Sequence, residues 1–348
     1  MAVGFHLRDL GDLMQKTEIS VVIIGRNEGN RLVRCLDSVA AMSRSFGPVE
    51  VIYVDSCSSD GSVAYAETHA GKTIALTGGR LSAARARNAG WQAASGRLIL
   101  FLDGDTILHP DFPAKALAAF DDPKVVVVWG HRREIHPEVS IFNRVLDLDW
   151  IYPPGLAEIC GGDALMARAA LEKVGGFNPE LIAGEEPDLC RRLRASGGLI
   201  QHIDAPMTGH DMAMDSWSQY WKRAVRAGHA YAEIAHLYKQ TGDRLWSAAS
   251  RQNAIQVTAY TLVILAAIVG SIVSLSPVWI VLLLLGALVI VSRTAYKAKW
   301  KSSSMLTMFL FGIHSHLQKF PIFVGQIRYW SNARRKWRTE LIEYKKPL

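Results

Sequence analysis

The chain has 348 residues, enough for a catalytic domain and a second region, and its 39 Lys and Arg exceed its 32 Asp and Glu by 7. This modest positive excess comes without a stripe of basic and aromatic residues before residue 250, which argues against a nucleic-acid-binding protein. The cysteines form no closely spaced pair, which excludes the usual zinc and disulfide patterns and fits a reducing compartment; they are Cys35, Cys57, Cys160 and Cys190.

Residues 1–18 lack an apolar core after their first basic residue, so we expect an N-terminal extension and not a signal peptide. Short, nearly continuous apolar runs follow, as in strands that are buried on both faces of a sheet. Mixed segments with helical spacing separate them, and the alternation predicts an α/β domain with a doubly wound, mostly parallel sheet over residues 19–235. The predicted strands are 19–25, 49–55, 97–103 and 124–130, and the predicted helices lie within 27–45, 59–70 and 81–95.

Polar residues follow three of these strands, at the ends where parallel strands of an open sheet bind ligands. The first strand leads to Arg26 and Glu28, the second ends in Asp55, and the third leads to Asp103 and Asp105. Asp-Gly-Asp is also an ordinary turn sequence. Three successive strands that bring acids to one edge nevertheless favour a binding site over three unrelated turns.

Two common nucleotide motifs are missing from the sequence. The first strand is not followed by the G-x-G-x-x-G pattern of dinucleotide sites, and the glycines near residue 80 come without the Lys-Ser or Lys-Thr pair of a P-loop. Two carboxylates spaced i, i+2 can instead hold a hard divalent cation that itself binds a diphosphate.

Five segments in order resemble family 2 glycosyltransferases of the GT-A fold, from about Ser20 to about Tyr231. They are ISVVIIGRNEG, VIYVDSCSSDGS, ARARNAGWQAASGRLILFLDGDT, GGDALMARAALEKVGGF and GEEPDLCRRL. The resemblance implies a GT-A domain that transfers a sugar from a nucleotide-sugar donor, most commonly a UDP-sugar, with Mn²⁺ or Mg²⁺. It also implies the role of each motif residue.

The D-x-D element of that family corresponds to Asp103-Gly104-Asp105. The resemblance implies that Asp105 binds the metal and that Asp103 lies near the metal and the ribose. His210 stands where some relatives use a histidine on the metal or the diphosphate, although a lone histidine is more often structural.

The nucleotide pocket is the second set of residues that the resemblance implies. Asp55 would accept a hydrogen bond from the base, and Arg26, Glu28 and Arg87 would line the pocket. The family often has a second acid after Asp55, whereas this chain has Ser56, so its base contacts could differ.

The catalytic pair implied by the resemblance is Glu185-Glu186, with Glu186 as the base where the family usually has Asp. The same residues also read as an ordinary helix start, since acids in a first turn favour the helix dipole. Both readings can hold together. Asp188 is the competing acid, but its spacing from Arg191 and Arg192 predicts a supporting ion pair.

Processive members of the family carry Q-x-x-R-W on a late helix. The corresponding stretch here, residues 219–228, fails that spacing and so indicates transfer of a single sugar. Asp163, Trp221 and Arg223 are further candidates for contact with the acceptor or the diphosphate.

Beyond a linker at residues 236–252, the composition indicates a C-terminal α-helical membrane region at 253–330. Residues 254–275 carry no charge and would measure about 33 Å as a helix, which is long enough for a bilayer core. A second apolar helix is expected at 278–296, and a buried hairpin of a soluble protein is the alternative. The link between the two is uncharged.

Two stretches, residues 292–301 and 331–346, are rich in Lys and Arg, and the positive-inside rule places both in the cytoplasm. An even number of crossings follows, and two spans fit. Charges and a proline interrupt residues 305–330, which we expect to lie along the membrane interface. Residues 331–348 are then a basic cytosolic tail.

Together these features predict an inverting glycosyltransferase at the cytosolic face of the cytoplasmic membrane, with membrane lipids as partners and no nucleic acid. Its acceptor would be a hydroxyl of a lipid-linked saccharide, as in cell-surface polysaccharide or glycolipid synthesis. One alternative is a polyprenyl-phosphate glycosyltransferase, whose ionised acceptor needs no base, so the retained glutamate pair counts against it. The other is a non-catalytic sugar-nucleotide-binding membrane protein.

Overall fold

The computed structural model describes residues 18–79, 81–239 and 244–337. Nearly all of the expected N-terminal extension (1–18) therefore lies outside the described residues. So do the middle of the expected linker and residues 338–348 of the expected tail.

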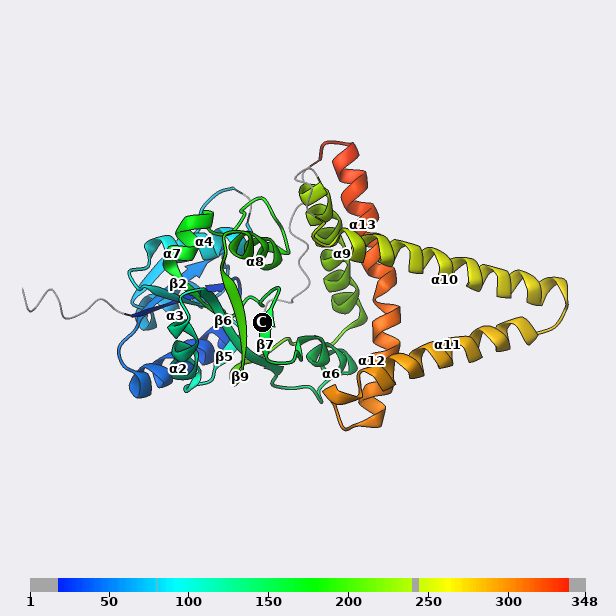
Figure 1. Cartoon of the computed structure of the whole chain (residues 1–348), viewed down its shortest axis with the longest axis horizontal. Helices are drawn as coiled ribbons and strands as arrows, with labels where there is room; N and C mark the ends of the chain where they lie inside the picture. Colours follow the sequence, from blue (N-terminus) through cyan, green and yellow to red (C-terminus); the bar gives the residue numbers. More distant parts are fainter. Residues whose placement is uncertain (1–17, 80, 240–243, 338–348) are drawn as a thin grey trace, which may run out of the picture.

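A single mixed sheet forms the centre of the N-terminal domain (Figure 1). Its first four strands in space are parallel, β8 is antiparallel to both of its neighbours, and β6 and β9 are again parallel. β7 (Gly155–Ala157) pairs with β9. The order across the sheet is β3 (Lys72–Ala75), β2 (Glu50–Asp55), β1 (Ile19–Gly25), β4 (Leu98–Asp103), β8 (Ala164–Ala167), β6 (Val125–Glu134), β9 (Leu199–His210) and β5 (Thr106–Leu108).

Helices connect these strands, as the alternating pattern predicts, and the mostly parallel α/β class is confirmed. The helices of the domain are α2 (Asn30–Phe46), α3 (Ser62–His69), α4 (Ala83–Ala93), α5 (Phe112–Leu117), α6 (Ile141–Asp147), α7 (Arg168–Val174) and α8 (Glu185–Ala195). The predicted strands correspond to β1, β2, β4 and β6, although β6 runs four residues further than the predicted end at 130.

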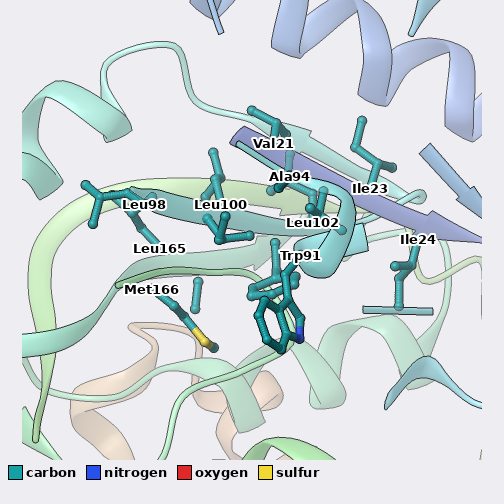
Figure 2. Packing of buried hydrophobic residues seen from close by; sticks show 14 of the residues in the cluster. Val21, Ile23, Ile24, Trp91, Ala94, Leu98, Leu100, Leu102, Leu165 and Met166 are labelled. Atoms are coloured by element: carbon teal, nitrogen blue, oxygen red, sulfur yellow. The ribbon is translucent and has the colours of Figure 1, made fainter. Parts of the chain in front are cut away.

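The core lies along the central strands. Figure 2 shows Leu98, Leu100 and Leu102 of β4 beside side chains of β1 and β8, with Trp91 of α4 against them. The labelled residues of β1 include Val21 and Ile23, and those of β8 are Leu165 and Met166. Full burial of one such aliphatic side chain stabilises a fold by about 1.5–3 kcal/mol. The apolar strands thereby give a rigid base to the polar residues at their carboxyl ends.

The C-terminal part is helical: α9 (Trp217–Lys239), α10 (Ser247–Val273), α11 (Val278–Lys297), α12 (Met305–Leu317) and α13 (Lys319–Arg334). α9 and α13 pack closely, since a Cβ at Gly228 would lie 1.9 Å from the Ile322 carbonyl oxygen. The segment expected as a linker, 236–252, is helical at both ends, because α9 continues to Lys239 and α10 begins at Ser247.

α10 and α11 project away from the sheet as a pair (Figure 1). Among the described residues, these are the two helices that are long and apolar enough to cross a membrane. Their bounds differ from the expected spans 254–275 and 278–296 mainly at the start of α10. α11 has no buried residue, so its apolar side chains face outward.

Candidate active site

The predicted strand ends meet at one edge of the sheet. Gly25 at the end of β1 pairs in register with Asp55 of β2, and Ile24 pairs with Asp103 of β4. The loops that follow β1 and β2 are joined, since the backbone N–H of Asn27 donates to Ser58 Oγ over 2.8 Å. The acids of three strands therefore belong to one surface.

The residues predicted to line the nucleotide pocket lie at this edge in different environments. Arg26 is exposed, whereas Glu28 is buried and its Oε2 lies 3.0 Å from Arg31 Nε. Asp55 is also buried, and its carboxylate accepts hydrogen bonds from the backbone and hydroxyl groups of Ser58. Glu28 and Asp55 thus order their own loops, beside any contact with a nucleotide.

Asp103-Gly104-Asp105, which we call the metal turn, begins with the last residue of β4. Its glycine is held against β1 by a 2.8 Å hydrogen bond from its N–H to the Ile24 carbonyl. A Cβ at Gly104 would lie 3.2 Å from both that carbonyl oxygen and Glu28 Cγ, so a larger residue would press on both. The Asp103 side chain is partly exposed, while Asp105 is buried.

Arg87 of α4 is the buried centre of the site. One of its nitrogens, Nη2, lies 2.9 Å from Asp103 Oδ1. The other, Nη1, lies 2.8 Å from Glu185 Oε1 and 3.1 Å from Glu186 Oε1. One guanidinium group therefore joins the predicted metal turn to the predicted catalytic pair, a contact that no sequence motif indicates.

α8 begins at the catalytic pair and carries three acids in its first turn, which the helix dipole favours. The predicted ion pair of Asp188 is confirmed, with Arg192 Nη2 at 2.7 Å from its Oδ2. The hydroxyl of Tyr238 also donates to Asp188 Oδ1 over 2.9 Å. Asp188 thus binds Arg192 and Tyr238, whereas Glu186 contacts Arg87.

The pKa of the Glu186 carboxyl is shifted toward neutral pH. Burial raises the pKa of Glu186 to about 7, the negative charge of Glu185 acts in the same direction, and Arg87 opposes both. A carboxylate with such a pKa accepts protons readily near neutral pH.

If Glu186 is the base, kcat/KM for sugar transfer should rise as the pH increases through about 7 and then level off, because only the ionised carboxylate accepts a proton. A pH profile at saturating Mn²⁺ measures this. In Glu185→Gln the rise in kcat/KM should occur at lower pH, because the negative charge that helps to raise the pKa of Glu186 is gone. A flat profile between pH 5.5 and 8.5 would contradict the assignment.

His210 ends β9 and lies beside the metal turn, with Nε2 at 3.1 Å from Asp105 Oδ2. Burial lowers the pKa of His210, and the positive charge of Arg132 acts in the same direction. Burial therefore favours the neutral imidazole, which is the form that binds metals. On its other side, Nδ1 lies 3.7 Å from Glu134 Oε2.

The donor set at this point fits a cation that a substrate helps to bind. In the described part of the chain, no three His, Cys, Asp or Glu side chains are arranged to hold a metal by themselves. A hard divalent ion such as Mg²⁺ is commonly held by one or two carboxylates together with substrate phosphates and water. Asp103 and Asp105 offer carboxylates of that kind, and His210 adds an imidazole nitrogen beside Asp105.

Asp163, which we predict to contact the acceptor or the diphosphate, is buried next to the metal turn. Its Oδ1 accepts a hydrogen bond from the backbone N–H of Asp103 over 3.0 Å, and its Oδ2 accepts one from Thr208 Oγ1 over 2.7 Å. Arg132 Nη1 lies 3.3 Å from the same Oδ2 and 3.5 Å from Asp103 Oδ2. Asp163 therefore supports Asp103 from within the fold.

Two residues of the site, Arg132 and Trp150, have no counterpart in the sequence predictions. Arg132 Cζ lies 4.9 Å from the centroid of the Trp150 ring. Arg132 lies two residues after the apolar run of β6, among the polar residues that end this strand, so the strand-end rule could have found it, whereas Trp150 lies in no motif. Both line a pocket of about 660 Å³ beside the metal turn, together with Ile107, His109, Ile151 and Pro206.

The remaining predicted residues lie on α9. Trp221 is tilted against Trp217 with ring centroids 5.9 Å apart. Burial raises the pKa of Tyr152, and the positive charge of Arg223 opposes this rise. Gln219 Oε1 accepts hydrogen bonds from the backbone N–H groups of residues 215 and 216, so this glutamine stabilises the start of the helix. Contact of Trp221 and Arg223 with the acceptor or the diphosphate stays a prediction.

Residues 20–175 match the family model described as glycosyl transferase family 2. The chain is 24% identical over 190 residues to the glycosyltransferase AglE of Haloferax volcanii, covering 51% of this chain and 62% of that protein. It is 26% identical over 217 residues to the pre-mycofactocin glycosyltransferase of Mycobacterium tuberculosis, covering 56% of this chain and 43% of that protein. The matches thus span less than two thirds of these curated relatives.

A solved structure has the same fold over most of both chains. It is a mannosyltransferase, PcManGT from Pyrobaculum calidifontis, in complex with GDP-Man and Mn²⁺. The TM-score is 0.63 at 20% identity, and the match covers 91% of this chain and 88% of that one. The GT-A fold, followed by C-terminal helices, is therefore shared.

Proposed function

From the match of residues 20–175 to the family model of glycosyl transferase family 2, we propose that the chain transfers one sugar from a nucleotide-diphosphate sugar to an acceptor hydroxyl, with inversion. The acceptor is a saccharide carried on a lipid at the cytosolic membrane surface. The observation that carries the proposal is the cluster around Arg87, where one guanidinium contacts both Asp103 and Glu186.

The donor lies at the carboxyl edge of the sheet in this proposal. Asp103, Asp105 and His210 would hold Mn²⁺ or Mg²⁺ together with its diphosphate. When bound, such an ion acts as a Lewis acid and neutralises the charge that develops on the leaving nucleoside diphosphate. Asp55 and Glu28 border the space for the nucleoside in this proposal, which is the role that the resemblance to the family implies for them.

The transfer itself needs one group that accepts a proton. Glu186 takes the proton of the acceptor hydroxyl as its oxygen bonds to the anomeric carbon, and the bond from that carbon to the diphosphate oxygen breaks. A single displacement on the opposite face inverts the anomeric configuration. The raised pKa of Glu186 supports a hydroxyl acceptor, because a phosphate acceptor is already ionised and needs no base.

The C-terminal helices support a membrane-bound acceptor. α10 and α11 expose apolar side chains along lengths that suit a bilayer, and Lys297, Lys299 and Lys301 follow at the end of the pair. Both ends of the pair then lie on one side, next to the catalytic domain. A lipid-linked saccharide would be held within reach of that domain.

The full chain purified in detergent tests the function directly. UDP- and GDP-sugars are supplied with and without Mn²⁺, and lipid-linked saccharides are compared with a polyprenyl phosphate as acceptors. We expect metal-dependent transfer to the saccharide, with an inverted linkage by NMR. Transfer to polyprenyl phosphate alone would support the alternative reaction. The absence of both donor hydrolysis and sugar transfer, with every donor supplied, would contradict the proposal that the chain is an enzyme.

Asp105→Asn is expected to abolish the enhancement of nucleoside-diphosphate binding by Mn²⁺, because the variant removes the negative charge from the buried end of the metal turn. Calorimetric titration with UDP or GDP, with and without Mn²⁺, measures the loss. The control is Asp111→Asn, an exposed acid in the next loop, which should bind as the native chain does. Undiminished enhancement in Asp105→Asn would remove Asp105 from the metal site.

A further inference from the structure

A four-residue segment, Leu148–Ile151, lies between the active site and the C-terminal helices; we call it the linking segment. Its two apolar ends, Leu148 and Ile151, belong to a cluster with Met308 and Phe311 of α12. The ammonium group of Lys301 donates to the Leu148 carbonyl over 2.7 Å. The segment is therefore packed against the C-terminal helices and not only against the sheet.

Asp149 adds a polar contact to the same helix. Its Oδ2 lies 3.2 Å from Nε2 of His314, a buried residue of α12. His314 Nδ1 lies 2.8 Å from the hydroxyl of Tyr220 on α9. In the tautomer with its proton on Nε2, His314 donates to Asp149 and accepts from Tyr220, so both ring nitrogens are satisfied.

The residue between these contacts, Trp150, points to the catalytic side. Its ring lies 4.8 Å from the His210 ring, centroid to centroid, and the two planes are nearly perpendicular at 82°. The guanidinium group of Arg132 also lies over the Trp150 ring, and its Nη1 is 3.5 Å from Asp103 Oδ2. Trp150 is also a wall of the 660 Å³ pocket, so it is shared by that pocket and the metal turn.

We propose that the pocket beside the metal turn receives the sugar ring of the acceptor against Trp150, and that Asp149 and His314 are positioning residues for Trp150. The proposal rests on the proposed function. A tryptophan offers a large apolar face on which the C–H face of a sugar packs. Because the neighbours of Trp150 in sequence are held by α12, the C-terminal helices determine where that face lies.

The chain contains a matched control two residues further along α12. His316 also has both ring nitrogens within hydrogen-bond distance of hydroxyl groups, at 2.9 Å from Tyr260 and 2.9 Å from Thr294. Its partners lie on α10 and α11, so His316 joins the C-terminal helices to one another. Loss of His316 disturbs the helices and leaves the linking segment in contact with His314.

The test uses the full chain in detergent with a lipid-linked saccharide acceptor. His314→Ala should raise the acceptor KM about tenfold, the effect of roughly one lost hydrogen bond on a positioned group, while the donor Kd stays native. His316→Ala should change neither constant. Asp149→Ala should behave like His314→Ala, and the double variant should be no worse, since both remove the same contact.

Asp149→Asn is the conservative variant. Its side-chain oxygen still accepts from His314 Nε2, so it should recover most of the affinity lost in Asp149→Ala. An equal loss of donor and acceptor affinity in the His314 and His316 variants would indicate general destabilisation and overturn the proposal.

Hydrogen exchange gives a readout that does not depend on activity. The peptide that contains residues 148–151 should exchange faster in His314→Ala than in the native chain or His316→Ala. Unchanged exchange and an unchanged acceptor KM would overturn the positioning role. If exchange responds as expected while the native chain transfers no sugar to any acceptor, the linking segment is coupled to α12 and the proposed function is wrong.

Discussion

Glu186→Gln is expected to lower the rate of sugar transfer by about 10²–10⁴-fold, the usual contribution of a general base. Glutamine keeps the shape of the side chain and can still accept a hydrogen bond from Arg87, but it cannot take a proton. The fold around Arg87 should therefore survive. Single-turnover transfer measures the rate, and calorimetry with the nucleoside diphosphate should give a nearly native donor affinity.

Two variants show whether the motif is read in the correct register. Asp188→Asn should cost some stability and little activity, because Asp188 pairs with Arg192 and Tyr238. Glu186→Asp is the usual family residue but is shorter by one methylene, so activity should drop unless the loop at Gly184 adjusts. An inactive Asp188→Asn together with an active Glu186→Gln would assign the base to Asp188.

The strands that the sequence predicts well are those buried on both faces. β1, β2 and β4 begin within one residue of their predicted starts because their apolar runs are nearly continuous. β8 has an apolar run of only four residues, and β9 mixes polar residues with Pro206, so neither is distinct in the sequence. The antiparallel insertion of β8 between β4 and β6 depends on pairing between distant segments, which local patterns do not contain.

The active site shows the same difference between features that local sequence motifs predict and contacts between distant segments. The residue types and their places at strand ends or at the start of α8 were predictable, since each belongs to a local motif. The contact of Arg87 with Asp103 and Glu185 joins residues that lie 16 and 98 positions apart, so only the folded chain reveals it. Trp150 is identified only by its neighbours in space, His210 and Arg132.

Arg87→Met is expected to have the largest effect on stability, because it removes a buried charge that contacts three carboxylates at once. The groups left without it are Glu185, which is buried, and Asp103 and Glu186, which are partly exposed. Removing one partner of a buried ion pair costs about 3–5 kcal/mol. The free energy of unfolding, measured by denaturant titration of the full chain in detergent, should fall by about that amount.

A graded series separates this effect from the loss of any arginine. Arg97→Met removes an exposed ion pair with Glu18 and should cost only about 0.2–1 kcal/mol. Arg87→Lys keeps the charge but loses the fork that reaches several carboxylates, so its loss should lie between the two. Equal losses of unfolding free energy in Arg87→Met and Arg97→Met would mean that the ion pairs around Arg87 do not stabilise the fold more than an exposed pair does.

Arg87→Lys, as the milder variant, also tests the link between the cluster and the base. Arg87 lowers the pKa of Glu186 against the opposing effects of burial and Glu185. A lysine places its single charge less closely on this carboxylate, so the pKa of Glu186 should rise further. The pH at which kcat/KM reaches half its plateau should then move to higher values. The opposite shift from that of Glu185→Gln would establish that both residues act on one titrating group; an unmoved profile in both variants would assign the base elsewhere.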